Sequence, residues 1–354
     1  MKAIHQLVAG FSNGDAISNE ARVLQSLFRS WGCASDIFCE NRRILPELRT
    51  TTRDLAEAAT LIGPEDAVIL HLSIGSPANL IFPTLPGRKV IYYHNITPPH
   101  FFRGIQEEIA AHLRMGLDQT KQLAGAADLN LAVSRFNADE LEAIGYRNVE
   151  VIPLMLDPRQ WEGPADRAVL SELQDGLLNI LFVGRCAPNK CIEDLLFATY
   201  YLERYVEKNC RLIHVGSSAG LERYEALLRT KAQELGLSRV HFAGSVRPEQ
   251  LRAYYQSATV FLCLSEHEGF CIPLLEAMAH RIPVLAYAAG AVPDTLQGAG
   301  VLFHEKRFDL IAETIGRIAR DSTLRSAILE GQTVRLNAID RKALAQRWQR
   351  YLIT

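Results

Sequence analysis

Two glutamates with a glycine and a proline between them form the segment of this sequence best suited to chemistry. Glu268 and Glu276 are separated by seven residues and follow an apolar run that ends at Leu264. Gly269 allows close backbone approach, and Pro273 suits the first turn of a helix, whose leading N–H groups are unpaired and attract anions. We expect Glu276 in that first turn. Carboxylates beside a bound diphosphate would accept hydrogen bonds from ribose or sugar hydroxyls, because a second anion would be repelled.

A second segment of similar form carries two cations. Gly184, Arg185 and Lys190 follow another apolar run at the point where it leads into a turn. A guanidinium can bind a diphosphate through paired hydrogen bonds, and an ammonium can bind it as a point charge. Alternatively, both could be surface cations, Glu276 could only complement a helix dipole, and Glu268 could be an acid of a surface loop.

Three further signals also follow apolar runs. Gly244, Ser245 and Val246 form a turn whose backbone could reach the edge of a nucleobase. Gly14 lies in the first loop, which could cover phosphates, although its glycines lack the spacing of a dinucleotide site. His94 lies at the end of the apolar run of residues 89–93. Its position predicts that it faces a cleft between domains, and a structural or a functional role fits this residue.

The absent motifs narrow the chemistry. The sequence contains no Asp-x-Asp, no P-loop and no His-Glu-x-x-His. Metal-bridged sugar transfer, P-loop chemistry and zinc proteolysis therefore lose support. We expect no metal, so that Arg185, Lys190 and helix amides meet the charge of a leaving diphosphate.

Composition excludes several classes of partner. The 354 residues carry a net charge of −2 with a pI of about 6.6, so attraction to nucleic acid is not expected. The seven cysteines lack the short spacing of a zinc knuckle or a redox dithiol, which predicts reduced thiols in the cytoplasm. Neither a signal peptide nor a membrane span of ~18 apolar residues is expected.

Basic residues near the carboxyl-terminal end leave peripheral contact with the inner membrane open, because they could meet anionic lipid. The alternative is a solvated helix face. The residues are Arg335, Arg341, Lys342, Arg347 and Arg350.

Short apolar runs alternate with helix-period segments, a pattern typical of an α/β fold with parallel sheets. The first series of predicted strands covers residues 4–8, 35–39, 67–72, 89–93, 129–133 and 149–152. The second series covers residues 179–183, 211–215, 239–242, 259–264 and 283–286. A Pro- and Gly-containing loop at 152–175 separates them, which predicts two doubly wound domains. We place the first at residues 1–160 and the second at 161–337, while periodicity predicts a final helix in 338–354 that must pack on one of them.

With these residues in place, the chain resembles the retaining GT-B glycosyltransferases of family GT4, which include bacterial mannosyl-, glucosyl- and rhamnosyltransferases of polysaccharide and O-antigen assembly. The resemblance covers nearly the whole chain and is strongest from Phe182 to Phe303. Gly184 to Lys190 is similar to the family's diphosphate-binding turn, and Glu268 to Glu276 to its E-x7-E signature. The implied fold is two Rossmann-like domains facing across a cleft, with the final helix crossing back to the first domain.

The resemblance also implies roles for single residues. Arg185 and Lys190 would bind the donor diphosphate, Glu276 the ribose, and Glu268 the transferred sugar. His94 matches a family histidine near the reacting centre. The remaining donor contacts would come from the backbone of Gly269, Phe270, Cys271 and Ile272. Two departures stand out: the first loop lacks the frequent Gly-Gly pair, which puts the role of Gly14 in doubt, and Cys191 replaces a common glycine.

The function expected from the resemblance is that of a retaining hexosyltransferase. It would move a hexosyl group, with mannosyl favoured, from a nucleotide-diphosphate sugar to a hydroxyl of a glycan or lipid-linked glycan. GDP-mannose is the first expectation for the donor, and a UDP-sugar the second. The alternatives are a sugar-nucleotide epimerase or phosphorylase of similar architecture and a nonenzymatic sugar-nucleotide-binding subunit. The oligomeric state, the linkage and the acceptor are not predicted.

Overall fold

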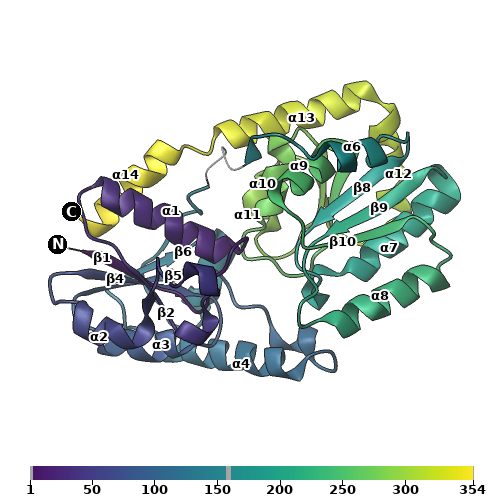
Figure 1. The fold of residues 1–354 in the computed structure, drawn as a ribbon. Helices are drawn as coiled ribbons and strands as arrows, with labels where there is room; N and C mark the ends of the chain where they lie inside the picture. The colour runs from purple at the N-terminus through teal and green to yellow at the C-terminus, as the bar shows by residue number, and fades with distance from the viewer. Residues whose placement is uncertain (1–2, 157–160, 354) are drawn as a thin grey trace. The chain divides into compact units, whose positions relative to one another are not determined.

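A computed structural model describes residues 3–156 and 161–353, which form two compact units (Figure 1). The described part of the first unit comprises residues 3–100, 107–156 and 340–353, and that of the second comprises 101–106 and 161–339. The predicted domain boundary between residues 160 and 161 falls at the edge of residues 157–160, which lie outside the described residues.

The first unit is built on a parallel sheet of seven strands in the order β3-β2-β1-β4-β5-β6-β7. Its central strand β4 (Ala67–Leu72) is buried along its whole length, as expected of a parallel strand covered on both faces. The other strands are β1 (Ile4–Leu7), β2 (Ile37–Cys39), β3 (Arg53–Asp54), β5 (Arg88–Tyr93), β6 (Leu129–Ala132) and β7 (Val149–Val151). The order reverses beside β1 and β4, and ligands bind at such a switch point in open α/β sheets.

Helices cover both faces of this sheet (Figure 1). Helix α1 and the final helix α14 lie on one face, and α2, α3 and α4 lie on the other. The bounds are α1 (Ala16–Ser30), α2 (Ala58–Leu61), α3 (Pro77–Ile81), α4 (Glu107–Gln122), α5 (Arg135–Ala143) and α14 (Arg341–Leu352).

The final helix packs on the first unit, as the family resemblance implied. Trp348 is fully buried, and its ring lies 6.1 Å from that of Phe28 on α1 and 5.1 Å from that of Tyr92 on β5. The amino end of α14 is capped by Asp340, whose side chain accepts hydrogen bonds from two backbone N–H groups. The aromatic cluster therefore joins residues from both ends of the sequence in one core.

A carboxyl group is buried close to this cluster. Both oxygens of Glu20 on α1 accept a hydrogen bond from the backbone N–H of Met155, at 3.1 and 2.9 Å. Burial raises the pKa of Glu20 to about 8, although the Met155 N–H partly opposes the shift. An unfolded chain releases this proton near the ordinary value of 4.5, so the contribution of Glu20 to the free energy of unfolding should be fully present below that pH and be lost as the pH rises towards 8.

We therefore expect Glu20→Gln to stabilise the chain at alkaline pH. The amide keeps an acceptor for Met155 and has no charge to bury, so the variant should gain about 2 kcal/mol over the native chain near pH 8 and lose this advantage near pH 4. Urea unfolding at several pH values measures the difference. The exposed Glu108→Gln is the control, and equal pH dependence in native chain and Glu20→Gln would contradict the prediction.

The second unit contains a parallel sheet of six strands in the order β10-β9-β8-β11-β12-β13. The strands are β8 (Leu178–Val183), β9 (Cys210–Val215), β10 (Val240–Gly244), β11 (Val260–Cys263), β12 (Val284–Tyr287) and β13 (Val301–Phe303). The helices are α6 (Arg167–Leu173), α7 (Ile192–Tyr201), α8 (Glu222–Glu234), α9 (Pro248–Ser257), α10 (Ile272–Ala279), α11 (Val292–Leu296), α12 (Phe308–Arg320) and α13 (Ser322–Asn337). Helices α7, α8 and α12 pack together on one face, and α9, α10 and α13 lie on the other (Figure 1).

Every predicted strand is present, which confirms the α/β class, but two short strands were missed. Arg53 and Asp54 form β3, a two-residue edge strand of charged side chains with no apolar pattern. Residues Val301–Phe303 form β13, which at three residues is too short to show a period. Both lie at sheet edges, where pairing with one neighbour, and not the local sequence, determines the strand.

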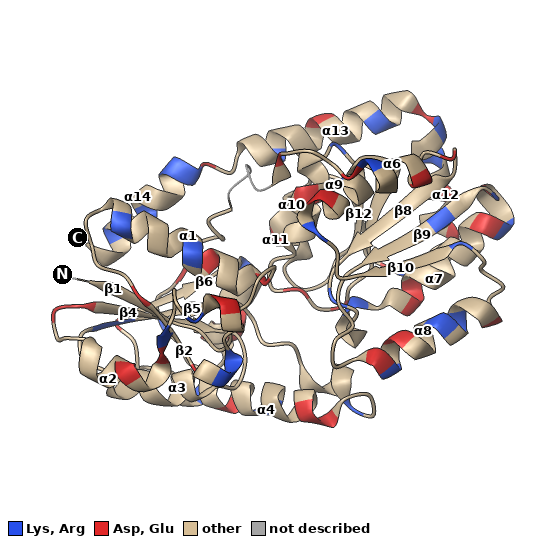
Figure 2. Cartoon of the chain, in the orientation of Figure 1, with Lys and Arg blue, Asp and Glu red and all other residues tan. Residues whose placement is uncertain are grey.

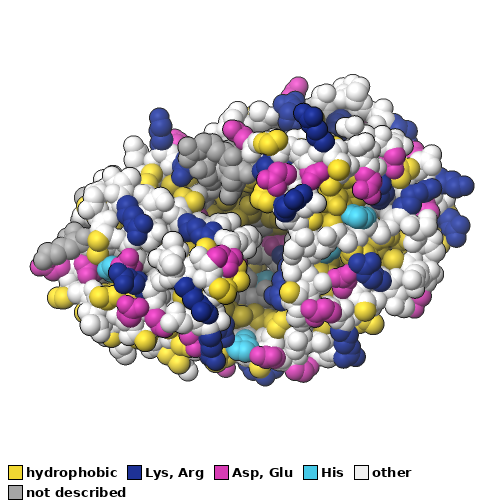
Figure 3. Space-filling view, viewed as in Figure 1, with side chains coloured by type: hydrophobic (Ala, Val, Ile, Leu, Met, Phe, Trp, Pro, Cys, Tyr) yellow, Lys and Arg dark blue, Asp and Glu magenta, His cyan; other side chains and the backbone are white. Residues whose placement is uncertain are grey.

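Charged side chains of both signs are mixed along most helices, such as α8 and α13 (Figure 2). The face shown in Figure 3 likewise intersperses basic and acidic side chains. Helix α14 differs, because all its charged residues are Lys or Arg. One of them is engaged inside the unit, since Arg347 donates to the backbone oxygen of Val151. Among the described residues, no helix is long and apolar enough to cross a membrane.

Candidate functional site

The loop from β11 to α10 places the first glutamate at the head of a helix. Strand β11 ends at Cys263, and Cys271 turns the chain into α10 with a left-handed φ of 68°. Within the described residues, the backbone N–H groups from Gly269 to Ile272 have no hydrogen-bond acceptor. Together with the dipole of α10, these groups form an anion-binding end of the kind predicted.

Lys190 and Glu268 meet at this loop. The ammonium of Lys190 lies 2.7 Å from each oxygen of Glu268, and the two side chains are 20% and 8% exposed. Burial lowers the pKa of Lys190, but the carboxylate more than offsets this, so the pKa lies above its ordinary value. The ammonium therefore stays charged, and it balances the buried charge of Glu268.

Asn189 joins the two segments that carry this pair. Its side-chain amide donates to the backbone oxygen of His267 at 3.1 Å, and its own backbone oxygen accepts from Glu266 at 2.9 Å. Cys191, the next residue but one, adopts a left-handed φ of 48° that a glycine would adopt more easily. The cysteine thus keeps the turn that the family's glycine provides, at the cost of some backbone strain.

Arg185 presents an exposed cation, on which the charge of Glu222 acts without an ion pair among the described residues. Its guanidinium donates to the backbone oxygen of Ala219 at 3.0 Å, and within the described chain no carboxylate lies at ion-pair distance. Burial lowers its pKa, which still leaves an arginine charged. The turn beneath is tight, because a Cβ on Gly216 would lie 1.8 Å from the backbone oxygen of Gly184. This guanidinium is held in place with its charge available to a ligand.

Glu276 lies in a different place from the one predicted. It is the fifth residue of α10, beyond the first turn, so it does not complement the helix dipole there. Its oxygens accept from the Tyr255 hydroxyl at 2.6 Å and the Trp161 indole N–H at 3.2 Å. Burial raises its pKa, and both donors oppose the shift. Each oxygen retains a lone pair for a further donor such as a hydroxyl.

Sequence reasoning did not identify Tyr255 or Trp161. Tyr255 lies on α9 in a helix-period pattern that is indistinguishable from core packing, and Trp161 lies in the loop between the two series of strands. Neither pattern signals a hydrogen bond to a glutamate that is distant in sequence.

The remaining predicted glycine turns follow strands β10 and β1. Gly244 ends β10 with a left-handed φ of 66°, and Ser245 and Val246 follow it. Gly14, with a φ of 75°, lies exposed in the loop between β1 and α1 of the first unit. A hollow of about 290 Å³ lies beside this loop and is lined by Gly10, Ser12, Asp15, Arg43 and Ser73 among others. Gly14 does not line it.

His94 follows the end of β5 in the first unit and is part-buried. Its Nε2 lies 2.9 Å from Nδ1 of His71, and the two rings stack at 5.1 Å. Burial, followed by the effect of His71, holds the pKa of His94 well below its ordinary value. The next residue, Asn95, has a left-handed φ of 88°. A side chain embedded in this way remains a neutral imidazole near neutral pH.

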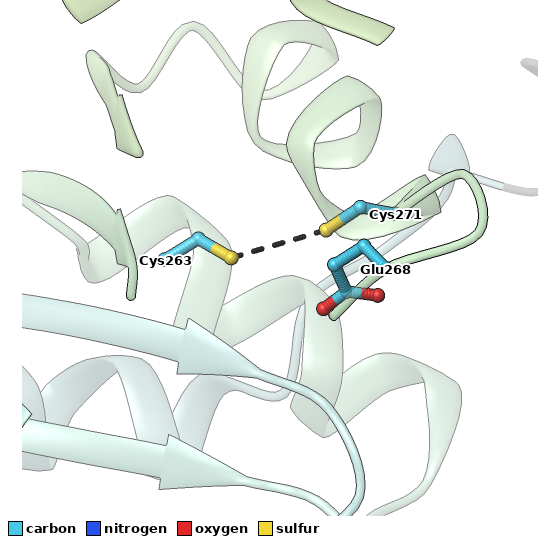
Figure 4. A group of neighbouring side chains, drawn as sticks. All are labelled: Cys263, Glu268 and Cys271. Carbon is cyan, nitrogen blue, oxygen red and sulfur yellow. Dashed lines mark hydrogen bonds between the residues drawn. The ribbon is translucent and has the colours of Figure 1, made fainter. Parts of the chain in front are cut away.

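Two cysteines approach each other behind Glu268 (Figure 4). Their sulfurs, on Cys263 and Cys271, are 4.0 Å apart, and all the cysteines are free thiols. The two sulfurs and a Glu268 oxygen lie within 4.8 Å of one another, a spacing that could hold a metal ion. The ammonium of Lys190 already balances this carboxylate.

Gly290 also supports the Glu268 loop, and sequence reasoning missed it. Its φ is +54°, and a Cβ there would lie 2.5 Å from the backbone oxygen of Glu268. That same oxygen accepts a hydrogen bond from the N–H of Ala291 at 2.8 Å. The glycine therefore permits close contact between the two loops.

We expect Gly290→Ala to displace Glu268 and lower turnover about tenfold, because the added methyl group meets backbone that cannot rotate away. Steady-state kinetics of nucleoside diphosphate release measures the loss. Gly236→Ala, also at a left-handed φ but with open space around its Cβ, controls for backbone strain alone. Equal losses in the two variants would show that contact with Glu268 is not the cause.

Comparison with known proteins shows what the second half of the chain resembles. Residues 171–332 match the family model described as glycosyl transferases group 1. The chain is 34% identical over 199 residues to D-inositol 3-phosphate glycosyltransferase of Nocardia farcinica, covering 52% of this chain and 44% of that protein. It is 36% identical over 144 residues to GDP-mannose:cellobiosyl-diphosphopolyprenol alpha-mannosyltransferase of Xanthomonas oryzae, covering 40% and 37%. The matches thus span less than half the length of these curated relatives.

The fold extends the likeness over the whole chain. Sucrose-phosphate synthase from Thermosynechococcus elongatus superposes with a TM-score of 0.76 at 18% identity, covering 99% of this chain and 98% of that one. At this identity the likeness shows the fold alone. Residues 171–332 are thus similar to the glycosyl transferases of group 1, and the fold of the chain is that of the GT-B glycosyltransferases.

Proposed function

We propose that the chain is a retaining hexosyltransferase that uses a nucleotide-diphosphate sugar, with GDP-mannose as the first donor to test. The acceptor is a hydroxyl of a glycan or a lipid-linked glycan. The observation that carries the proposal is the pairing of Lys190 with Glu268 beside the unpaired N–H groups from Gly269 to Ile272. A cation and helix amides suit a diphosphate, and the carboxylate suits a sugar hydroxyl.

The mannosyl preference rests on a relative. The Xanthomonas protein whose name includes GDP-mannose is 36% identical over 144 residues, the highest identity among the relatives compared above. Its name also includes a diphosphopolyprenol, a lipid-linked acceptor. We therefore propose GDP-mannose as the first donor to test and a lipid-linked glycan as the first acceptor. UDP-sugars are the second class of donor.

In the proposed mechanism the donor diphosphate lies at the head of α10, and Arg185 and Lys190 stabilise the charge that develops on it as it leaves. Each such contact contributes about 3 kcal/mol to the transition state. Glu276 accepts a ribose hydroxyl in addition to its bond from Tyr255. The bond from the anomeric carbon to the diphosphate breaks, the acceptor oxygen forms its bond on the same face, and the departing phosphate takes the acceptor's proton.

Glu268 is poorly suited to be a covalent nucleophile in this scheme. A carboxylate that is bonded through both oxygens to an ammonium is stabilised as an anion and is therefore a weaker nucleophile. When the diphosphate competes for Lys190, Glu268 gains a free lone pair for the sugar. We propose that the reaction needs no metal, because the two basic side chains supply the positive charge.

A donor screen followed by product analysis tests the function. Thermal unfolding with GDP-, UDP-, dTDP- and ADP-sugars should show one base stabilising the chain more than the others, since a ligand of the folded state raises the unfolding temperature. Incubation with that donor and a polyprenyl-diphosphate glycan should give a new glycosidic bond and free nucleoside diphosphate. Isomerised donor or sugar 1-phosphate would indicate the epimerase or phosphorylase alternative. Binding with no turnover on any acceptor would indicate a nonenzymatic subunit.

We propose a cytoplasmic location with peripheral contact at the membrane face, carried by the basic surface of α14. Sedimentation with vesicles that contain anionic lipid, compared with neutral vesicles, tests this contact. Equal sedimentation with the two would count against it.

A further inference from the structure

A chain of hydrogen bonds in the first unit leads from a backbone carbonyl to His94. The side-chain amide of Gln6 donates to the backbone oxygen of Ala21 at 2.9 Å. The Gln6 oxygen lies 2.9 Å from Nε2 of His71, and Nδ1 of His71 lies 2.9 Å from Nε2 of His94. Gln6 and His71 are buried, at 0% and 1% exposure, so water does not complete their bonds.

The first link fixes the orientation of the glutamine. A backbone carbonyl can only accept a hydrogen bond, so the atom of Gln6 that faces Ala21 must be the NH₂ group. The other end of the amide, facing His71, is then the oxygen, which can only accept. Nε2 of His71 must therefore carry a proton.

The protonation states of both histidines follow from the proton on Nε2 of His71. His71 is neutral because burial lowers its pKa to about 3, so with a proton on Nε2 its Nδ1 has only a lone pair. Nε2 of His94 must then donate to it. His94 is also neutral, which leaves its Nδ1 unprotonated. Within the described residues this Nδ1 has no hydrogen-bond partner. It is nevertheless not one of the fully buried polar side-chain atoms that lack a partner.

We propose that Gln6 and His71 are positioning residues that hold His94 as a hydrogen-bond acceptor, with its unprotonated Nδ1 turned to a hydroxyl group of the sugar substrate. The inference rests on the proposed function for the identity of that substrate, but the protonation pattern does not. The stacked rings of His71 and His94 and the contact of Tyr92 with His94, with centroids 4.5 Å apart, fix the plane in which the acceptor points. An unprotonated ring nitrogen can accept a hydrogen bond from a hydroxyl group, but it cannot donate one.

The protonation pattern can be observed directly. In the chain labelled with ¹⁵N-histidine, the ring nitrogen shifts and their couplings to ring protons distinguish the tautomers. We expect His94 and His71 both as the Nε2–H form at neutral pH, assigned by the signals lost in His94→Ala and His71→Phe. An Nδ1–H tautomer or an imidazolium at either ring would overturn the proposal.

Steady-state kinetics tests whether Gln6 affects turnover through His94. Gln6→Met removes the acceptor for His71 with little change in volume, and it should lower kcat/KM about tenfold, the worth of one hydrogen bond, as His94 loses its fixed tautomer. In the His94→Ala background the same substitution should change kcat/KM no further, because it acts only through His94. Additive losses, or full turnover in His94→Ala, would overturn the proposal.

A matched control separates positioning from folding. Gln119 is also a buried glutamine of the first unit, whose oxygen accepts from Ser76 at 3.0 Å and from Asn79 at 2.7 Å. Gln119→Met should lower stability comparably and leave both the His94 tautomer and kcat/KM unchanged; a matching loss of kcat/KM would show that any such core change suffices. Absence of transfer by the native chain would count against the proposed function, while the NMR experiment still decides the protonation pattern.

Discussion

Replacing Arg185 with alanine should lower kcat by about 10²- to 10³-fold while the chain stays folded. Among the described residues the guanidinium donates to the backbone oxygen of Ala219, and the acidic group whose charge acts on it, Glu222, is exposed and not at ion-pair distance. Its removal therefore strands no buried carboxylate. A cation that stabilises the leaving diphosphate acts mainly in the transition state, and losing such a contact costs about 3–4 kcal/mol of activation free energy.

Arg325→Ala is the matched control for that variant. Arg325 likewise donates to a backbone oxygen, that of Thr259 at 2.9 Å, and burial lowers its pKa in the same direction, although its side chain is part-buried and that of Arg185 is exposed. Thr259 lies just before β11, away from the carboxyl ends of the strands. Release of nucleoside diphosphate should fall only in Arg185→Ala. Native kcat in that variant would remove Arg185 from the proposed mechanism.

Lys190→Met should lower both stability and turnover, and the two losses can be separated. Removal of the ammonium leaves Glu268, 8% exposed, as a nearly buried carboxylate without its counterion. Breaking a buried pair in this way costs about 3 kcal/mol, and the variant also loses a charge on the diphosphate, so kcat should fall by at least about 10². Urea unfolding and steady-state kinetics measure the two effects.

The double variant Lys190→Met with Glu268→Gln distinguishes the causes. It removes the stranded charge, so most of the lost stability should return while turnover stays low. Arg211→Met breaks another ion pair, with Asp175 at 2.7 Å, near the start of β9, and should lower stability without lowering kcat. Recovery of turnover in the double variant would mean that Lys190 serves only to neutralise Glu268.

The sequence predicted the sheets and much of the candidate site because both depend on local patterns. Apolar runs identify strands, and a glycine-containing turn after a strand places Arg185, Lys190 and Glu268 at the carboxyl ends of a sheet. These residues come from turns that follow β8 and β11, which are neighbours in the sheet. Adjacent parallel strands bring their ends together, so the meeting of Lys190 and Glu268 follows from topology.

The residues that sequence reasoning missed act through contacts that no local pattern encodes. Tyr255 bonds Glu276 from another helix, and Gly290 matters because its missing side chain leaves room for Glu268. The depth of Glu276 in α10 was also misjudged, because the helix begins at Ile272 after a left-handed turn at Cys271. A cysteine rarely marks such a turn, so the sequence offered little to locate the start.

The place of α14 in the core of the first unit has a consequence for synthesis in the cell. Trp348 is made after residues 161–339 of the second unit, yet it fills a position between Phe28 and Tyr92. The second unit can fold on the ribosome as an almost continuous segment, whereas the amino-terminal sheet must wait with an open apolar surface until residues 341–352 emerge. During that interval the nascent chain presents the kind of exposed apolar surface that makes partly folded chains prone to aggregate.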